Sequence, residues 1–352
     1  MPETDGLPPT RVALVGAGWF GRLHADAWAR IPDARLVAVC DADAGLARAA
    51  AGDTGALATA DLDAALAEAP DLVDIATPPA AHPGLIARLA PSVRMLICQK
   101  PFCDGLEGGR AAAALAARHG CRLAVHENIR FQPWNREARR LIDAGALGEP
   151  WRVAFRLRPG DGRGPEAYLA RQPYFRTMPR FLVHETAVHW IDCFRFLMGE
   201  VEGVFARLAR RNPALAGEDA ATILFDFAQG RTGLFDGDRL LDHAATDRRR
   251  TLGEMLLEGS DATLRLDGEG RLWLRRFGAG EETPHPHAWE DRGFGGDCVR
   301  TCCAAILADW RAGRDSPMEA RFYVRNQVVE EAIYASAASG RRVTTTGAEA
   351  GA

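Results

Sequence analysis

Short apolar runs alternate with helix-like stretches along the first 128 residues of the chain. The run at 12–15 is followed by a segment of helical character at 22–31, which ends before Pro32. The runs that we expect to form strands are 12–15, 36–40, 56–58, 72–76, 94–98 and 123–125. Strands that alternate with helices of this length are typical of a parallel sheet covered on both faces. We therefore expect residues 1–128 to form an α/β domain with a doubly wound parallel sheet.

The pattern changes after residue 128, where longer runs alternate apolar with polar residues. Such alternation is typical of antiparallel strands that bury one face. The expected strands are 151–158, 203–211, 222–227, 232–236, 252–258, 262–266 and 271–277. With a helix expected at 181–198 and capped by Gly199, they indicate an α+β domain over 129–343 with a largely antiparallel, open sheet. We expect residues 344–352 to be a disordered tail.

A glycine-rich turn follows the first expected strand. Its sequence is Gly16-Ala17-Gly18-Trp19-Phe20-Gly21. In dinucleotide-binding domains the first glycine permits a tight turn, the second leaves space for a pyrophosphate and the third lets the helix pack on its strand. Asp41 stands 20 residues after Gly21, where it would accept hydrogen bonds from ribose hydroxyls and repel a 2′-phosphate, so NAD is favoured over NADP. The alternative is a glycine turn with a purely structural role.

Lys100 is the only lysine of the chain, which has 42 arginines. A lysine ammonium can hand a proton to a reacting oxygen and recover it, whereas an arginine guanidinium stays protonated. Lys100, Gly16, Asp41 and Thr77 all lie where a parallel strand is expected to end. Ligands bind beyond the carboxyl ends of such strands, so we expect one crevice to collect these residues. The alternative is a lysine that survived by chance in a genome that favours arginine.

The helix expected at 181–198 carries polar residues on an otherwise apolar surface. Glu185, His189 and Asp192 are spaced by four and three residues, which places them in one line on an α-helix. A zinc site is not expected, because His184 and His189 are five apart and point about 140° away from each other. A histidine held by a carboxylate one turn earlier is oriented as a general base. The alternative is a core histidine whose hydrogen bond Glu185 satisfies.

Composition narrows the class of protein. The 352 residues are 47% hydrophobic and 26% charged, as in a globular enzyme of two domains. The net charge of -4 and the pI of 6.2 leave no strongly basic face, so we expect neither a nucleic acid nor a membrane as partner. The eight cysteines follow no metal or disulfide pattern and no signal peptide is recognisable, so we expect a cytoplasmic protein without a metal.

Together these features resemble the glucose-fructose oxidoreductase and inositol dehydrogenase (Gfo/Idh/MocA) family of NAD(P)-dependent sugar and polyol oxidoreductases. The resemblance extends over 11–343. It rests on the glycine turn, Asp41, the turn at 76–78, Gln99-Lys100-Pro101 in place of the family's Glu-Lys-Pro, and 185–192 in place of its Asp-x-Gly-x-His-x-x-Asp. Within the family, the segments 126–134 and 156–189 resemble the D-apiose dehydrogenase group.

The resemblance implies a role for each matching residue. Lys100 and His189 would be the catalytic pair, with Glu185 at the acidic catalytic position. The residues that would bind the cofactor are Gly16, Gly18, Trp19, Phe20, Gly21, Asp41, Thr77, Pro78, His82, Gln99 and Lys100. The residues that would bind the substrate are Lys100, Arg130, Arg163, Glu185, Thr186 and His189. The open sheet would join subunits into a homodimer or homotetramer.

The chain departs from the family pattern at three positions. Gln99, Glu185 and Ala187 stand where the family has Glu, Asp and Gly. Gln99 removes a carboxylate that could stabilise the ammonium of Lys100. Glu185 carries its carboxylate one methylene further than Asp, which favours a substrate smaller than a six-membered cyclitol.

The expected reaction is hydride transfer from a sugar or polyol carbon to NAD. His189 would accept the hydroxyl proton, Lys100 would hydrogen-bond the reacting oxygen, and Glu185 would orient His189. The specific expectation is an aldopentose such as D-apiose, oxidised to its lactone. The alternatives are an NAD-binding sensor or repressor without turnover, and an NAD-dependent glycosidase.

Several other charged residues are candidates for substrate contacts. Arg130, Arg158, Arg163 and Arg180 could hydrogen-bond sugar hydroxyls, although arginines in such places more often pair with Asp or Glu. Asp236 and His243 flank a loop that follows an expected strand and are further candidates.

Overall fold

The structure is a computed structural model that describes residues 8–345 of the chain. The polypeptide forms two compact units. The first comprises the chain up to Asn128 together with Val299–Arg325, and the second comprises Ile129–Cys298 and the chain from Asn326 onward. The change between units after residue 128 coincides with the change in hydrophobic pattern.

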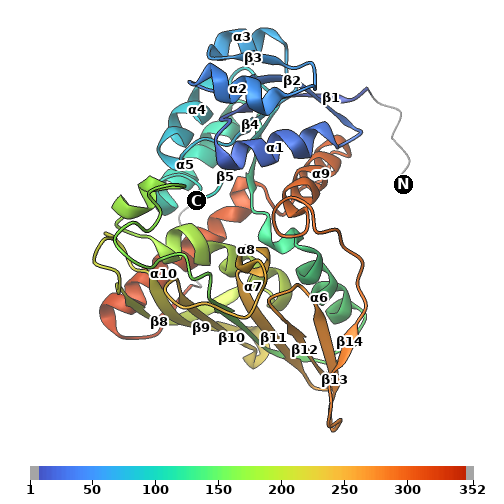
Figure 1. The fold of residues 1–352 in the computed structure, drawn as a ribbon, viewed down its shortest axis with the longest axis vertical. Helices are drawn as coiled ribbons and strands as arrows, with labels where there is room; N and C mark the ends of the chain where they lie inside the picture. Colours follow the sequence, from blue (N-terminus) through green and yellow to red (C-terminus); the bar gives the residue numbers. More distant parts are fainter. Residues whose placement is uncertain (1–7, 346–352) are drawn as a thin grey trace. The chain divides into compact units, whose positions relative to one another are not determined.

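The first unit contains a six-stranded parallel sheet with the strand order β3-β2-β1-β4-β5-β6 (Figure 1). Its strands are β1 (Thr10–Val15), β2 (Ala34–Cys40), β3 (Leu57–Thr59), β4 (Leu72–Ile75), β5 (Met95–Gln99) and β6 (Arg122–His126). Its helices are α1 (Trp19–Ala29), α2 (Ala44–Ala51), α3 (Leu62–Ala67), α4 (His82–Leu89), α5 (Gly105–Arg118) and α9 (Cys298–Arg311), the last of which begins at the unit boundary. Every residue of β4 and β5 is buried, as expected of parallel strands covered on both faces. The predicted doubly wound α/β fold is confirmed.

The segment Val299–Arg325 belongs to the first unit, although we expected it in the second. The backbone N–H of Val125, on β6, donates a hydrogen bond to the carbonyl of Met318 at 2.8 Å. Cys302, Ile306 and Leu307 of α9 are fully or almost fully buried. The correction has a simple cause, because a return of the chain to an earlier domain leaves no local pattern in the sequence.

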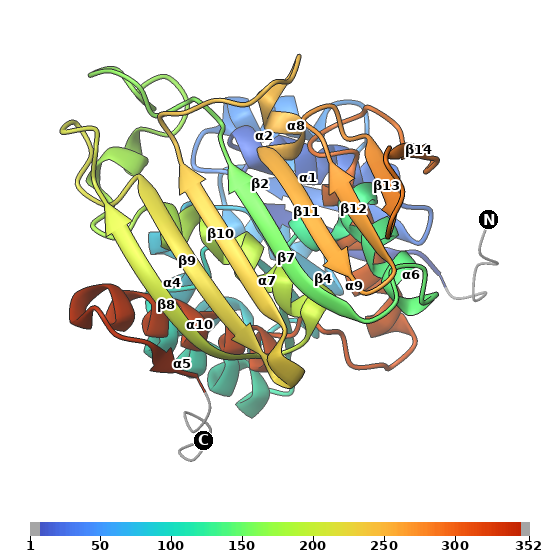
Figure 2. The same cartoon turned by 90° about the horizontal axis from the view of Figure 1, so that it is seen from below.

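The second unit contains a nine-stranded sheet with the order β14-β13-β12-β11-β7-β10-β9-β8-β15. Its strands are β7 (Pro150–Leu157), β8 (Val201–Ala209), β9 (Ala220–Phe227), β10 (Thr232–Asp238), β11 (Gly253–Gly259), β12 (Ala262–Leu266), β13 (Leu272–Arg276), β14 (Thr283–His285) and β15 (Val343–Thr344). The neighbours pair antiparallel, except that β7 and β10 are parallel. Figure 2 looks onto a face of this sheet that carries no helix, with α7 and α10 behind it. The predicted largely antiparallel, open sheet is confirmed.

Helices cover the other face of this sheet. They are α6 (Pro133–Asp143), α7 (Val188–Met198), α8 (Arg248–Thr251) and α10 (Ala320–Ser339), the last of which begins in the first unit. Short 3₁₀ turns in the two units occupy Pro79–Ala81, Ile129–Phe131, Pro173–Thr177 and Ala228–Gly230. Trp190 of α7 stacks on Phe155 of β7 with ring centroids 3.3 Å apart, and Phe194 meets Phe225 edge to face. These contacts anchor α7 to the centre of the sheet.

The helix expected at 181–198 consists of two different segments. Leu182–Ala187 is π-helical, and α7 follows at Val188. A π-turn contains more residues than an α-turn, so the straight line expected from α-helical spacing is wrong for Glu185. His189 and Asp192 lie in α7, which ends at Gly199 with φ of 95° as expected of a glycine cap.

The C-terminal tail begins later than we expected. Val343 and Thr344 form β15, which pairs with β8, and the N–H of Thr345 donates to the carbonyl of Glu202 at 3.0 Å. The expectation of disorder is therefore wrong for Thr344 and Thr345. The remaining residues of the expected tail, 346–352, lie outside the described residues.

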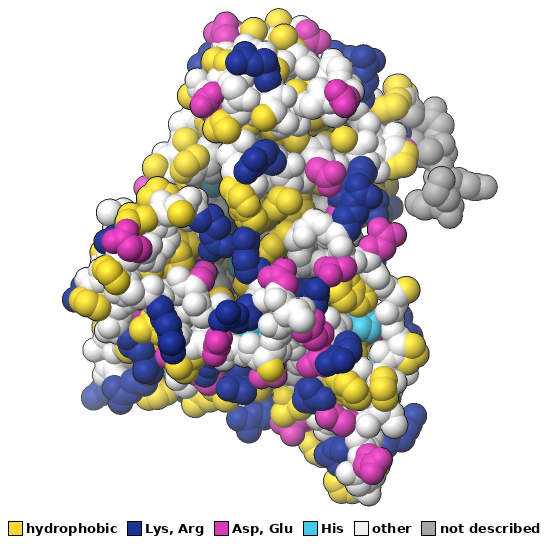
Figure 3. Space-filling view, viewed as in Figure 1, with side chains coloured by type: hydrophobic (Ala, Val, Ile, Leu, Met, Phe, Trp, Pro, Cys, Tyr) yellow, Lys and Arg dark blue, Asp and Glu magenta, His cyan; other side chains and the backbone are white. Residues whose placement is uncertain are grey.

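Acidic and basic side chains are interspersed on the face of the molecule shown in Figure 3. Partly exposed arginines pair with nearby carboxylates, as Arg30 does with Asp26 at 2.6 Å and Arg265 with Glu282 at 2.5 Å. This mixture agrees with the near-neutral composition. Within residues 8–345, no helix is both long and apolar enough to cross a membrane.

Gly21→Ala is expected to destabilise the first unit, because the added Cβ would lie 2.1 Å from the carbonyl oxygen of Gly16. Overpacking of this kind costs about 1–3 kcal/mol. Gly18→Ala is the matched control, since nothing lies within 4 Å of its added Cβ, and should change stability by about 0.5 kcal/mol or less. Urea unfolding without ligand measures both. Equal stability of the two variants would mean that α1 can move away from Gly16 at no cost.

Candidate active site

The glycine turn of the first unit leads from β1 into α1. Gly16 has φ of +100°, and a Cβ at this position would lie 2.7 Å from the backbone of Ala76, so the turn requires glycine. Gly18 directly precedes α1, whose N-terminus has no side-chain cap and no acidic residue in its first turn. Helix N-termini of this kind bind phosphate groups through backbone N–H groups.

The carboxylate of Asp41 is held directly after β2. The N–H of Ala17 donates to its Oδ2 at 2.6 Å, and the N–H of Asp43 donates to its Oδ1 at 2.9 Å. The first of these bonds ties Asp41 to the glycine turn. A carboxylate in this position can accept hydrogen bonds from ribose hydroxyls.

Thr77 lies in the turn that follows β4, and its hydroxyl group is available to a ligand. Its Oγ1 is buried and has no hydrogen-bond partner among the described residues. Buried polar groups are rarely left unsatisfied, so this hydroxyl fits contact with a ligand. The glycine turn, Asp41 and Thr77 thus suit a dinucleotide.

Four other residues expected at the cofactor site lie directly after the turns at Gly18 and Thr77. His82 is fully buried, with Nε2 2.9 Å from the carbonyl oxygen of Thr77, and burial lowers the pKa of its ring. Pro78 precedes the 3₁₀ turn that leads to His82. Trp19 and Phe20 begin α1 with their rings 5.7 Å apart, and both are half-buried. His82 therefore braces the turn at Thr77.

Lys100 directly follows β5 and is half-buried. Its backbone N–H donates to Oε1 of the preceding Gln99 at 3.0 Å. Gln99 itself is buried, and its Nε2 lies 2.8 Å from Nε2 of His24 and 2.9 Å from Nδ1 of His126. The side chain of Gln99 is therefore committed to protein contacts, where we expected it to contact the cofactor.

Asp74, on β4, extends this buried network. Its Oδ2 lies 2.6 Å from Nδ1 of His24 and accepts a hydrogen bond from Nε1 of Trp28 at 2.7 Å. His24, Asp74 and His126 are fully buried, and burial lowers the pKa of His126 to about 3. Sequence analysis did not identify this network, because its members come from separate strands and a helix.

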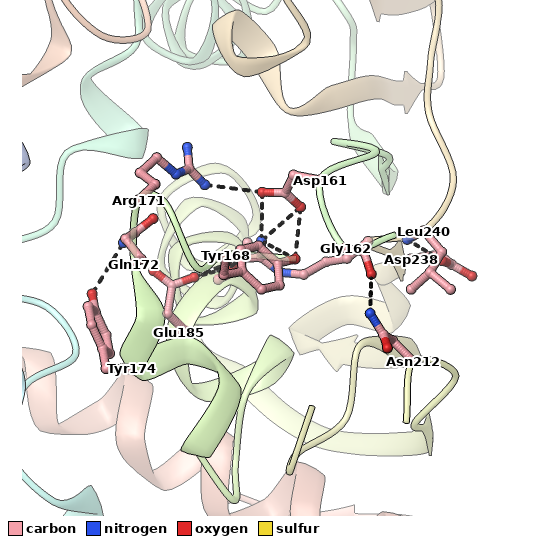
Figure 4. Close-up of polar contacts among 12 residues, drawn as sticks. Asp161, Gly162, Tyr168, Arg171, Gln172, Tyr174, Glu185, Asn212, Asp238 and Leu240 are labelled. Atoms are coloured by element: carbon pink, nitrogen blue, oxygen red, sulfur yellow. Dashed lines mark hydrogen bonds and ion pairs between the residues drawn. The ribbon is translucent and has the colours of Figure 1, made fainter. Parts of the chain in front are cut away.

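In the second unit, Glu185 belongs to a buried cluster around Arg239. We call it the Arg239 cluster and define it as Arg239, Asp161, Tyr168, Glu185 and Thr186. A terminal nitrogen of Arg239 donates to Glu185 at 2.8 Å and also to Thr186, while the other donates to Asp161 at 3.1 Å and to Tyr168 at 3.2 Å. Asp161, Tyr168 and Glu185 converge in Figure 4. Glu185, which we expected to orient His189, thus has Arg239 as an ion-pair partner.

Arg239 lies among aromatic rings as well as carboxylates. Its guanidinium is 4.7 Å from the ring centroid of Phe181 and 5.4 Å from that of Phe175. Burial alone would lower the pKa of Arg239, but the charges of Asp161 and Glu185 raise it overall. Sequence analysis missed Arg239. The sequence feature that could have indicated Arg239 is its position just after the expected strand 232–236, the same feature that made Asp236 a candidate.

His189 and Asp192 are both buried on α7. Asp192 accepts two hydrogen bonds from Arg130, each at 2.5 Å, and one from Asn326 at 3.1 Å. Arg130 therefore makes the pairing with an acidic residue that we considered as the alternative to substrate contact.

The remaining candidate arginines also contact the protein. Arg158 is buried and pairs with Asp236, and its backbone carbonyl lies 2.8 Å from Nδ1 of His243. Arg180 pairs with Glu331 at 2.6 Å. Arg163 is exposed and donates to the carbonyl of Leu240 at 2.6 Å.

The structure thus distributes the expected site residues between the two units. All of the expected cofactor residues lie in the first unit, and Gly16, Asp41, Thr77 and Lys100 follow the carboxyl ends of parallel strands. Arg130, Arg163, Glu185, Thr186 and His189 lie in the second unit.

Two family models match the chain. The model of the oxidoreductase family with an NAD-binding Rossmann fold matches residues 10–127, and that of the GFO/IDH/MocA C-terminal domain matches residues 135–264. The chain is 36% identical to D-apiose dehydrogenase of Paraburkholderia graminis, with 96% of this chain and 90% of the relative covered. It is 30% identical to D-apiose dehydrogenase of Rhizobium rhizogenes, with 94% and 96% covered.

A solved structure extends the comparison. An oxidoreductase from Agrobacterium radiobacter, in complex with NAD+, L-tartaric acid and magnesium, superimposes with a TM-score of 0.83 at 28% identity, with 96% of this chain and 98% of that chain covered. The similarity spans both units, and the sequence features noted above are those of a nicotinamide-dependent oxidoreductase. The chain belongs to the Gfo/Idh/MocA family of NAD-binding oxidoreductases.

Proposed function

We propose that the protein is a dehydrogenase that oxidises a CH–OH group of a sugar with NAD, and that its substrate is an aldopentose such as D-apiose, converted to the lactone. One observation carries the proposal of dehydrogenase chemistry. Gly16, Thr77 and Lys100 follow β1, β4 and β5, which are neighbouring parallel strands. A dinucleotide turn and a proton-donating side chain therefore belong to the same sheet edge. The two relatives named D-apiose dehydrogenase support the choice of sugar.

The side chains of this protein handle the proton and orient the substrate. NAD, when bound at the glycine turn and Asp41, supplies the acceptor for the hydride. Lys100 hydrogen-bonds the reacting oxygen and stabilises the negative charge that develops on it. His189 accepts the hydroxyl proton as general base.

Glu185 is proposed to bind sugar hydroxyls in addition to orienting His189. Glu185 is 6% exposed and its carboxylate pairs with Arg239, whose pKa is lowered by burial but raised overall by the charges of Asp161 and Glu185. An ionised carboxylate accepts strong hydrogen bonds from hydroxyl groups. Arg239 thereby gives Glu185 a counter-charge and holds it in one position.

We propose NAD in preference to NADP because of Asp41. Its carboxylate is anchored by two backbone N–H groups, and a 2′-phosphate beside it would meet a negative charge. We further propose a cytoplasmic homo-oligomer joined through the open sheet, where Trp151 and Leu224 are 54% and 45% exposed.

Formation of NADH, followed by absorbance with a panel of aldopentoses, aldohexoses and inositols, tests the proposed activity. Lys100→Arg is expected to lower turnover about a hundredfold or more, because the larger, planar guanidinium cannot place its N–H donors where the compact ammonium meets the reacting oxygen. The dissociation constant for NAD should stay within about threefold of the parent. The control is Arg118→Lys, the reverse exchange at an exposed position of α5, which should retain activity. Near-normal turnover of Lys100→Arg would refute the role of Lys100.

Asp41→Asn is expected to weaken the preference for NAD. The ratio of kcat/KM for NAD to that for NADP should fall about tenfold or more, because hydrogen bonds to a charged acceptor contribute about 1.5–3 kcal/mol. Asp53→Asn removes the same charge from an exposed site after α2 and should leave the ratio unchanged. An unchanged ratio in Asp41→Asn would contradict this assignment of cofactor choice.

Arg239→Met is expected to lower the free energy of unfolding by about 3–5 kcal/mol, because it leaves the buried carboxylate of Glu185 without its counter-charge. The double variant Arg239→Met/Glu185→Gln should lose less stability than the sum of the two single losses, by about 1 kcal/mol or more. Arg265→Met, in an exposed pair, should cost about 1 kcal/mol or less. Urea unfolding measures all four variants. Additive single losses would show that Arg239 does not hold Glu185.

A further inference from the structure

The amide group of Gln99 lies between two buried imidazole rings of the first unit. Its Nε2 is 2.8 Å from Nε2 of His24 and 2.9 Å from Nδ1 of His126, and the two ring centroids are 4.3 Å apart. Its Oε1 accepts the backbone N–H of Lys100 at 3.0 Å. The side chain of Gln99 thus connects helix α1, strand β6 and Lys100, the residue that we propose to hydrogen-bond the reacting oxygen of the substrate.

The orientation of this amide follows from the bond to Lys100. A backbone N–H is always a donor, so the atom of Gln99 that faces it must be the acceptor Oε1. The NH₂ group of Gln99 therefore faces the two rings, with one hydrogen available for each.

The protons of the two histidines follow in turn. Because Gln99 donates to both rings, Nε2 of His24 and Nδ1 of His126 must each present a lone pair. The ring proton of His24 then lies on Nδ1 and is donated to Asp74 at 2.6 Å, and that of His126 lies on Nε2 and faces the carbonyl of Val299 at 3.3 Å. Both rings are neutral in this arrangement, in agreement with the pKa of His126, which burial lowers to about 3.

The same rings and Cys303 form a group that could hold a metal ion, since their ligand atoms lie within 4.8 Å of one another. Asp74 and the carbonyl of Val299 are also the kind of outer partners that orient metal-bound histidines. However, zinc would need both lone pairs at about 2.0–2.1 Å, and these are already directed at the amide of Gln99. The hydrogen-bonded arrangement satisfies both ring nitrogens of each histidine without an added ion, while Oδ1 of Asp74 is buried without a partner among the described residues.

We propose that Gln99 is a positioning residue that links two neutral histidines to the backbone of Lys100, and that this role requires an amide at position 99. A carboxylate, the group that the family motif has there, presents only acceptors. It would face the lone pairs of both rings, which is repulsive unless one ring gains a proton. The effect on catalysis rests on the proposed function, whereas the hydrogen-bond pattern does not.

Replacement of the amide by a carboxylate has a defined consequence for the buried charges. The groups that face His126 are His24 on α1, Asp74 on β4 and Cys303 on α9, together with position 99 on β5. Gln99→Glu adds a second negative charge beside that of Asp74. Nearby negative charge favours the protonated ring, so at least one of the two histidines should become an imidazolium near neutral pH.

Nitrogen-15 NMR of histidine side chains tests the arrangement without reference to activity. In the parent chain we expect His24 as the Nδ1–H tautomer and His126 as the Nε2–H tautomer from pH 6 to pH 8, with resonances assigned from single histidine substitutions. Gln99→Glu should protonate one ring in this range. Gln229→Glu, an exposed change of the same kind, should alter neither resonance. The opposite tautomers in the parent, or neutral rings in Gln99→Glu, would overturn the proposal.

Kinetics tests the link to Lys100. Gln99→Glu should lower kcat about tenfold to a hundredfold, as expected for displacement of a reacting group, while the KM for NAD changes by less than about threefold. A second substitution, His126→Gln, supplies an amide donor to the introduced carboxylate and should restore part of kcat. Loss of kcat without rescue, or equal changes of kcat and KM, would reduce Gln99 to a general structural role and overturn the proposal.

Metal analysis separates the remaining alternative. We expect no stoichiometric zinc bound through Cys303, either in the protein as purified or after incubation with zinc. Stoichiometric zinc that is lost in Cys303→Ser would overturn the proposal in favour of a metal site. If NMR gives the expected histidine tautomers but Lys100→Arg has normal turnover, the role of Gln99 stands and the proposed dehydrogenase mechanism is contradicted.

Discussion

Parallel pairing of β1, β4 and β5 is the constraint on which the chemistry of the first unit depends. Because parallel strands end at the same edge, residues separated by some 80 positions in sequence become neighbours there. The edge holds the glycine turn, Lys100 and the hydroxyl of Thr77, which has no hydrogen-bond partner within residues 8–345. Among the described strand residues of this sheet, the buried polar ones are Thr10, Asp74, Gln99 and His126, so the last three have few other polar groups to contact.

The second unit contains buried charged residues that are paired with one another. Arg239 and Arg130 are both almost fully buried, and each has carboxylate partners within hydrogen-bond distance. Such pairs contribute little net stability, but their loss is costly, so they define the geometry of the residues they touch. Glu185 and Asp192 are thereby held in place on the π-helical segment and on α7.

Sequence reasoning succeeded where the determinants are local. The glycine turn, Asp41 and the alternating strands of the second unit are each specified by residues close together in the chain, and the fold class follows from them. It failed where distant segments meet, as in the pairing of Glu185 with Arg239 and the return of 299–325 to the first unit. Strands of two or three residues, such as β15, are too short to show a period, and nothing in the helical pattern distinguishes a π-turn from an α-turn.

The hydrogen bonds of Gln99 also bear on how such a sequence can change over generations. A ring nitrogen of His126 that offers a lone pair is compatible with an amide at position 99 and incompatible with a bare carboxylate. Positions 99 and 126 are therefore epistatic: a mutation at one alters which mutations the other tolerates. A lineage that moves between glutamine and glutamate at position 99 must pass through a less fit intermediate or change both residues together, so the two positions should be inherited as a unit.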